Sequence, residues 1–173
     1  MDETTEPAPK KHHVIRDLLL VILGILVLIQ LIPYGHAHSN PPVTQEPAWD
    51  SPETRALAES SCFDCHSNET TWYWYTYVAP FSWFVQHDVD EGRSALNFSE
   101  WDRPQEGAGE ISEVIGEGAM PPGYYTLIHS GARLSDAERQ QLIAGLEATF
   151  QNSPPIAGEG GGEQGGEVGE VGE

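Results

Sequence analysis

The sequence predicts an all-α protein in which one long apolar helix precedes a small helical domain. Three observations support this fold class. Residues 14–32 are almost wholly apolar, and residues 80–96 carry apolar side chains at helical spacing. Ser135 and Glu138 form an S-x-x-E capping box, which is typical of the start of a helix.

Composition limits the classes of partner that the protein can have. The 173 residues include 27 acidic and 8 basic side chains, which gives a formal net charge of -19. Phosphate binding needs a basic surface, so we expect no nucleic-acid partner. An acidic surface suits a basic protein partner, and it also serves simple solubility. The oligomeric state does not follow from the sequence.

The apolar segment 14–32 predicts a transmembrane anchor. As a helix it would extend about 28 Å, close to the ~30 Å hydrocarbon core of a bilayer. Lys10, Lys11 and Arg16 lie at its N-terminal side and no lysine or arginine follows until Arg55, which predicts that residues 1–13 are cytoplasmic. The rest of the chain is then expected on the extracytoplasmic side of the cell membrane. A cleaved signal peptide is the alternative, with Gly35 and Ala37 as small residues near a cleavage site.

The remaining segments are separated by their composition. Residues 33–52 are rich in proline and predict an extended tether. Residues 53–150 contain the predicted helices and form the expected domain. Residues 151–173 consist largely of glycine and glutamate, which predicts a disordered tail.

Helix signals divide the expected domain. Ser51 and Pro52 suit the cap and first turn of a helix over 53–60. Further helices are predicted over 80–96, around 110–117 and from the capping box to about residue 150.

The pentad Cys62-Phe63-Asp64-Cys65-His66 is the strongest chemical signal in the chain. A C-x-x-C-H run is typical of c-type haem attachment, in which two thiols bind the porphyrin and the histidine coordinates iron. The alternatives are weaker. A thioredoxin-like motif needs a βαβ pattern, a zinc site needs four ligands, and a disulfide over so short a loop stabilises little.

Met120 is predicted to be the second iron ligand. It precedes Pro121 and Pro122, so the backbone there is pushed out of the helical region and into a stiff loop. Methionine is a common second ligand of electron-transfer haem. His87 and His129 are the competing candidates.

Three further residues could contact the porphyrin. Trp72 and Trp74 belong to an aromatic run whose alternation suits an extended segment, and they could wall the cofactor or simply pack in the core. Arg93 could pair with a haem propionate, although a solvated surface position is the alternative.

These motifs together resemble a known family. The C-F-D-C-H pentad, the W-Y-W-Y run, N-F-S-E-W at 97–101, M-P-P at 120–122 and the Leu134-Ser135 helix start resemble the bacterial haem-binding domain family of membrane-anchored, single-haem c-type cytochromes. The resemblance covers about residues 39–150. It implies a cytochrome-c-like helical fold with one covalent haem, His66 as the proximal ligand and Met120 as the distal one.

One-electron transfer is the function that these features favour. Two fixed ligands leave no open site on the iron, so we expect an electron carrier with a redox partner protein, not an enzyme. A peroxidase-like enzyme or gas sensor would need an open or displaceable sixth position. A structural haem subunit of a membrane complex is a third hypothesis.

Overall fold

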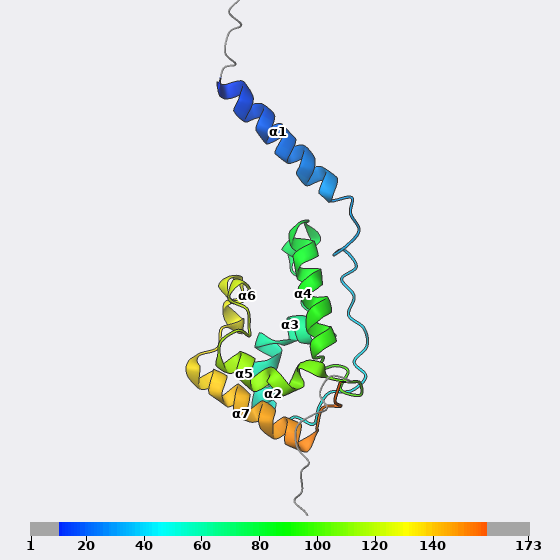
Figure 1. Cartoon of the computed structure of the whole chain (residues 1–173), viewed down its shortest axis with the longest axis vertical. Coiled ribbons are helices and arrows are strands. Elements are labelled where there is room, and N and C mark those ends of the chain that lie inside the picture. Colours follow the sequence, from blue (N-terminus) through cyan, green and yellow to red (C-terminus); the bar gives the residue numbers. More distant parts are fainter. Residues whose placement is uncertain (1–10, 159–173) are drawn as a thin grey trace, which may run out of the picture. The chain divides into compact units, whose positions relative to one another are not determined.

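The computed structural model describes residues 11–158. The predicted cytoplasmic segment (1–13) and the predicted tail (151–173) lie mostly outside the described residues. Within the described part the regular structure is helical (Figure 1). No strand forms there, and the bridges are isolated pairs, Gln45 with Glu100 and Pro104 with Ile156. The all-α fold class is confirmed.

Most helices follow one another closely along the chain, but a long connection over residues 30–51 separates the first from the second. In chain order they are α1 (Lys11–Ile29), α2 (Pro52–Ser61), α3 (Phe63–His66), the 3-10 turn η1 (Trp74–Tyr77), α4 (Phe81–Ala95), the 3-10 turn η2 (Glu106–Glu110), α5 (Ile111–Gly116), α6 (Gly123–Ile128), the 3-10 turn η3 (Ser130–Ala132) and α7 (Asp136–Asn152).

The chain divides into two compact units. The first contains the chain up to His38 together with Trp72–Gln86, and the second contains Ser39–Thr71 and the chain from His87 onward. Helix α4 begins in the first unit and ends in the second.

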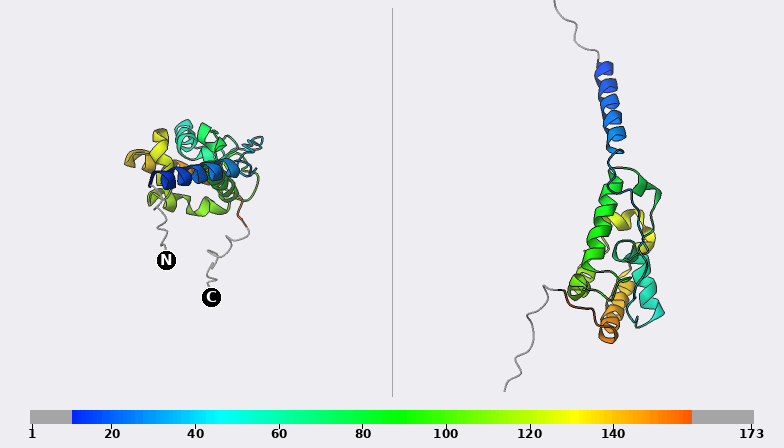
Figure 2. Two further views of the ribbon diagram at one scale, coloured as in Figure 1. Left: turned by 90° about the horizontal axis from the view of Figure 1, so that it is seen from above. Right: turned by 90° about the vertical axis from the view of Figure 1, so that its right-hand side faces the viewer.

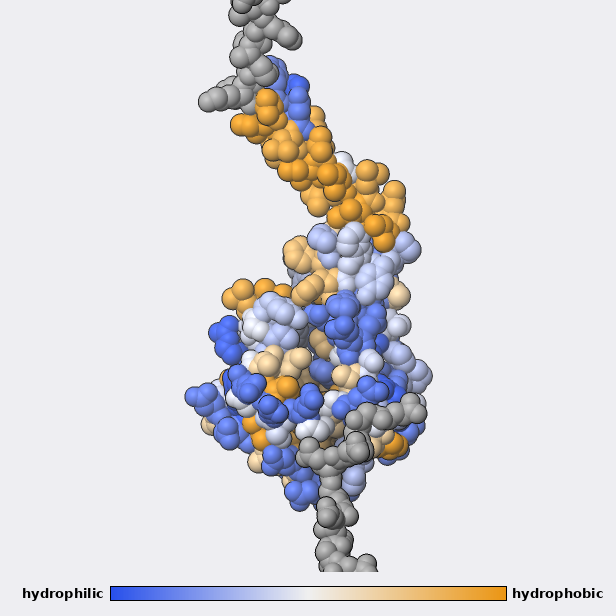
Figure 3. Space-filling model, in the orientation of Figure 1, coloured by the Kyte–Doolittle hydropathy of each residue, from blue (hydrophilic) through white to orange (hydrophobic). Residues whose placement is uncertain are grey.

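Helix α1 exposes its apolar side chains to the surroundings, as the orange surface in Figure 3 shows. It ends at Ile29, three residues before the end of the predicted anchor. No helix in the described part of the chain combines the length and apolar character needed to cross a membrane.

The rest of the first unit departs from the extended segment predicted for the aromatic run. Trp74–Tyr77 form a 3-10 turn, so the extended prediction is wrong there. His38 packs its ring against Trp72 and Tyr77, at centroid distances of 4.6 and 4.1 Å, and bonds the carbonyl of Thr76. This segment is therefore held by ring contacts and not by strand pairing.

The second unit is built on α7. Helices α2 and α5 both pack against α7, as the views in Figure 2 also show. The predicted caps form: Ser51 accepts a hydrogen bond from the backbone of Thr54, and Ser135 and Glu138 make the reciprocal capping box. Gly145 lies at the α2–α7 contact, where a Cβ would overlap Thr54.

The core of the second unit is apolar and aromatic. Phe63, Phe98 and Trp101 stack in series, with centroids 5.8 and 6.0 Å apart. Leucines and isoleucines of α5 and α7 complete it, namely Ile111, Ile115, Leu142 and Leu146. Phe63 is an interior residue of the pentad, so the core anchors that motif.

Candidate functional site

The pentad folds as a single helical turn directly after α2. The backbone nitrogens of Cys65 and His66 donate to the carbonyl of Cys62 at 3.1 and 2.9 Å. The turn therefore carries both sulfurs and the imidazole to the wall of one cavity. Covalent attachment of haem at these residues stays a prediction.

The cavity lies within the second unit and has a volume of about 380 Å³. That volume falls in the range of roughly 300–1,000 Å³ that small-molecule and cofactor sites occupy. Its lining is mainly apolar and includes Leu96, Phe98, Ile111, Val114, Ile115, Pro121, Pro122 and Leu142.

His66 is oriented by the segment that follows α4. Its Nδ1 lies 3.1 Å from the carbonyl oxygen of Leu96, and its own carbonyl accepts a hydrogen bond from the backbone of Phe98 at 2.9 Å. A carbonyl can only accept, so Nδ1 carries the proton and Nε2 keeps its lone pair. Burial lowers the pKa of His66. The residue is thus held as the neutral imidazole that a metal requires.

The two thiols are free and partly buried. Burial raises the pKa of Cys62 to about 11 and that of Cys65 to about 12, and the carboxylates of Asp88 and Asp64 raise the latter further. Both groups are therefore protonated at neutral pH, which slows their oxidation because the thiolate is the reactive form.

Met120 lines the same cavity from the loop between α5 and α6. Its backbone nitrogen donates to the carbonyl of Val114 at 3.1 Å, and 39% of the residue is exposed. The non-helical loop predicted from Pro121 and Pro122 is confirmed. A thioether and an imidazole can supply two ligands, which suits an iron whose other ligands come from a porphyrin.

Two tyrosines after Met120 were missed by reasoning from the sequence. The hydroxyl of Tyr125 donates to Asp64 Oδ2 at 2.6 Å, and that of Tyr124 donates to Asp88 Oδ2 at 3.0 Å. Burial and the Asp88 hydrogen bond raise the pKa of Tyr124 to about 12, so its phenol stays a donor at neutral pH. A Tyr-Tyr pair has no pattern that marks such a role.

Gly92 was missed for a similar reason. It lies in the interior of α4 and lines the cavity. A Cβ at this position would lie 2.5 Å from the carbonyl oxygen of Cys65. The available signal was a glycine in a helix interior, which often has a packing reason.

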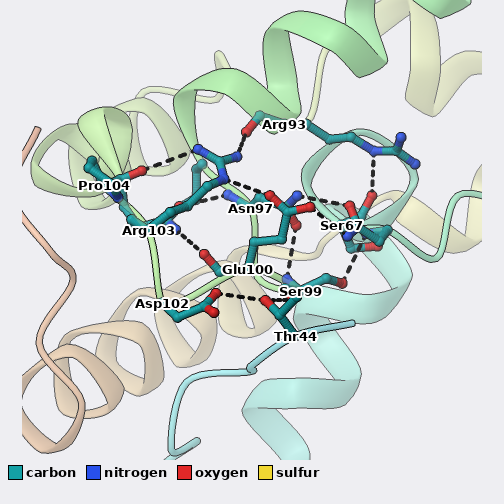
Figure 4. Close-up of polar contacts among 12 residues, drawn as sticks. Thr44, Ser67, Arg93, Asn97, Ser99, Glu100, Asp102, Arg103 and Pro104 are labelled. Carbon is teal, nitrogen blue, oxygen red and sulfur yellow. Dashed lines mark hydrogen bonds and ion pairs between the residues drawn. The ribbon is translucent and has the colours of Figure 1, made fainter. Parts of the chain in front are cut away.

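Arg93 is held by a polar network, part of which Figure 4 shows. Its guanidinium donates to the carbonyls of Ser67 and Ser39, to Asn40 Oδ1 and to Thr70 Oγ1, at 2.8, 3.1, 3.2 and 2.9 Å. It is absent from the cavity lining of the described residues. A propionate contact by Arg93 stays a prediction.

The same network fixes the segment around the N-F-S-E-W motif. Asn97 donates to Asn68 Oδ1 and accepts from the backbone of Ser99, both at 2.9 Å, and Glu100 accepts from Arg103 at 2.7 Å (Figure 4). Arg103 also donates to the carbonyl of Arg93. These bonds fix the segment whose Leu96 and Phe98 hydrogen-bond the side chain and the backbone of His66.

The other candidate residues lie elsewhere. His87 is exposed and pairs with Glu91 at 3.3 Å, while His129 stacks on Tyr125 at a centroid distance of 4.3 Å. Among the described residues neither lines the cavity. Trp72 and Trp74 belong to the first unit, and their role in binding stays a prediction.

The charge around the cavity is negative. Asp64, Asp88, Glu91 and Glu110 contribute to its lining, whereas the described lining contains no lysine or arginine. Burial also raises the pKa of Asp88.

Comparison with known proteins gives one family match. Residues 24–148 match a family model described as a haem-binding domain. No curated protein and no solved structure matches the chain significantly.

Proposed function

Because the chain belongs to the haem-binding domain family, we propose that it holds one haem covalently and transfers single electrons. The observation that carries this proposal is the meeting of two reduced thiols and a neutral imidazole at one apolar cavity. Cys62 and Cys65 would form the thioethers. When bound, the haem would supply an iron that changes its charge by one electron.

The roles of the two ligands follow from their surroundings. His66 commits Nδ1 to the carbonyl of Leu96, which leaves Nε2 for the iron. Met120 is the proposed second ligand, on a loop that two prolines stiffen. With both ligands in place no open coordination position remains, so the protein would act as a carrier and not as an enzyme.

Acid-acetone extraction tests the covalent attachment. Haem c stays with the polypeptide under these conditions, whereas non-covalent haem is released. We expect wild-type protein to retain its haem, and Cys62→Ala or Cys65→Ala to retain at most one thioether with a lower yield. Complete release from the wild type would contradict the proposal.

The spectrum of the ferric protein tests the assignment of Met120. A sulfur-to-iron bond gives a weak charge-transfer band in the far red. We expect this band in the wild type and its loss in Met120→Ala. The matched controls are His87→Ala and His129→Ala, which should keep it. A band that survives Met120→Ala would show that the ligand is another residue.

A gas sensor or peroxidase-like enzyme is a second candidate, favoured by the 39% exposure of Met120. An exposed ligand on a loop can be displaced by a small molecule. Carbon monoxide binding to the native ferrous protein distinguishes the two functions. A carrier with a fixed sixth ligand should bind it weakly and slowly, and tight binding would favour the sensor.

Membrane tethering through residues 14–32 is the topological part of the proposal. The apolar, exposed side chains of α1 and the basic residues before them support it. We expect the full chain to sediment with membranes and to keep its N-terminus, with the haem domain extracytoplasmic. N-terminal sequencing that began near His38 would instead identify a cleaved signal peptide.

A basic redox protein is the proposed partner. The acidic residues around the cavity would attract a positively charged surface towards the cofactor. The second-order rate constant of electron exchange with a small basic cytochrome should fall steeply as salt rises. A rate that does not depend on salt would exclude electrostatic steering.

A further inference from the structure

Helix α6 is an unusual element of the second unit because none of its residues is buried. Leu127 and Ile128 are 76% and 64% exposed, so apolar packing does little to fix this six-residue helix. Elements with few buried contacts open most readily. Helix α6 directly follows the Met120 loop, and the position of that loop therefore depends on other contacts.

Two phenols provide such contacts, and they reach different elements. Tyr125 donates to Asp64 within the attachment turn, at 2.6 Å, while Tyr124 donates to Asp88 of α4, at 3.0 Å. Adjacent residues of a helix point about 100° apart, so the short helix α6 can hydrogen-bond both the attachment turn and α4. All four of these residues line the cavity.

The Asp64 carboxylate is itself fixed. Its Oδ1 accepts a hydrogen bond from the backbone nitrogen of Thr71 at 2.8 Å, so Oδ2 is presented to Tyr125. On the other side, the ring of Tyr125 stacks on His129 at 4.3 Å. The bond between Tyr125 and Asp64 therefore joins two positioned groups.

We propose that Tyr125 is a positioning residue for the Met120 thioether, acting through its hydrogen bond to Asp64. The bond ties the loop of the second ligand to the same turn that carries the thiols and His66. Tyr124 and Asp88 hold the loop from the α4 side. Loss of the Tyr125 bond would loosen the loop that carries Met120 and let an external ligand compete with the thioether. This inference rests on the proposed ligation by Met120.

The test compares hydroxyl deletions that keep each ring. Tyr125→Phe and Tyr124→Phe are measured in the haem-loaded full chain, and Tyr77→Phe in the first unit is the matched control. The readouts are the far-red band of the ferric protein and the equilibrium constant for cyanide binding. A hydrogen bond to a carboxylate corresponds to roughly a tenfold change, so Tyr125→Phe should bind cyanide about tenfold more tightly and weaken the band. Tyr77→Phe should match the wild type.

Asp64→Asn alters the same hydrogen bond from the acceptor side. If Tyr125 acts through Asp64, the double variant Tyr125→Phe with Asp64→Asn should bind cyanide no more tightly than the stronger single variant. If the effects of the two substitutions on cyanide affinity add, this inference is wrong while the Met120 assignment still stands. The same holds if Tyr125→Phe changes neither the band nor the cyanide affinity. A wild-type spectrum without the band would overturn the Met120 assignment and this inference with it.

Discussion

Gly92 sets how closely α4 can approach the turn that carries the two thiols. A Cβ here would lie 2.5 Å from the carbonyl oxygen of Cys65 and 3.0 Å from its Cβ. In an exposed helix, alanine would be more favourable than glycine by about 1 kcal/mol. At Gly92 the overlap outweighs that gain, because backbone must move to relieve it.

We therefore predict that Gly92→Ala destabilises the domain by about 1–3 kcal/mol and lowers the haem content per chain. Urea unfolding and the pyridine haemochrome assay measure the two effects. Gly109→Ala is the matched control, because a Cβ there meets nothing within 4 Å. Equal stability of the two variants would show that the approach of α4 is not limiting.

At the residue scale, the sequence identifies groups whose chemistry depends on local spacing. Cys62, Cys65 and His66 are contiguous in one motif, and Met120 is marked by the prolines after it. The structure brings these four residues to one cavity. Asp64 and Tyr125 could not be paired in advance, because they are 61 residues apart and neither belongs to a repeating pattern.

At the scale of elements, Arg55 links α2 to its surroundings. Its guanidinium bonds both carboxylate oxygens of Glu46 at 2.8 Å and lies 5.3 Å from the ring centroid of Phe63. The hydrogen bond from Arg55 is the main cause of a lowered pKa at Glu46. The ion pair thus supports the helix that leads into the attachment turn.

This pair predicts an acid-sensitive contribution to stability. The pKa of Glu46 is lower in the folded state than its ordinary value of 4.5. Its stabilisation, about 1 kcal/mol, is therefore complete above pH ~5.5 and is lost as the pH falls through the folded pKa. The difference in unfolding free energy between wild type and Glu46→Gln should be constant from about pH 6 to 7 and shrink below about pH 5.

Helices α2, α4, α5 and α7 could be predicted because their signals are local. Ser51 and Ser135 mark the starts of α2 and α7, and helical periodicity marks α4 and α5. Helix α6 has the same length as α5, but it was missed because none of its residues is buried, so it lacks the core-facing apolar stripe that Ile111 and Ile115 give α5. The turn η1 was also missed, since alternating aromatics suit a strand and their ring contacts with His38 are non-local.

At the scale of the whole chain, the core of the second unit and the cavity share their walls. Five apolar side chains belong both to the buried core and to the cavity lining: Leu96, Phe98, Ile111, Ile115 and Leu142. A protein interior is normally close-packed, and an unfilled cavity removes contacts from every residue around it. We therefore expect the proposed haem to complete the packing of this core.

We therefore predict that a chain unable to retain haem keeps its helices but loses fixed packing. The double variant Cys62→Ser with Cys65→Ser, stripped of haem, should keep its far-UV circular dichroism, lose near-UV signal and bind the dye ANS. Its Tm should fall by more than about 10 °C, since 1 kcal/mol corresponds to roughly 4–8 °C in a domain of this size. Met120→Ala is the matched control, because it leaves both thiols in place and should keep the near-UV signal. If the double variant instead shows a wild-type near-UV spectrum and Tm, the core is complete without the cofactor, and the cavity is only a binding site within a preformed fold.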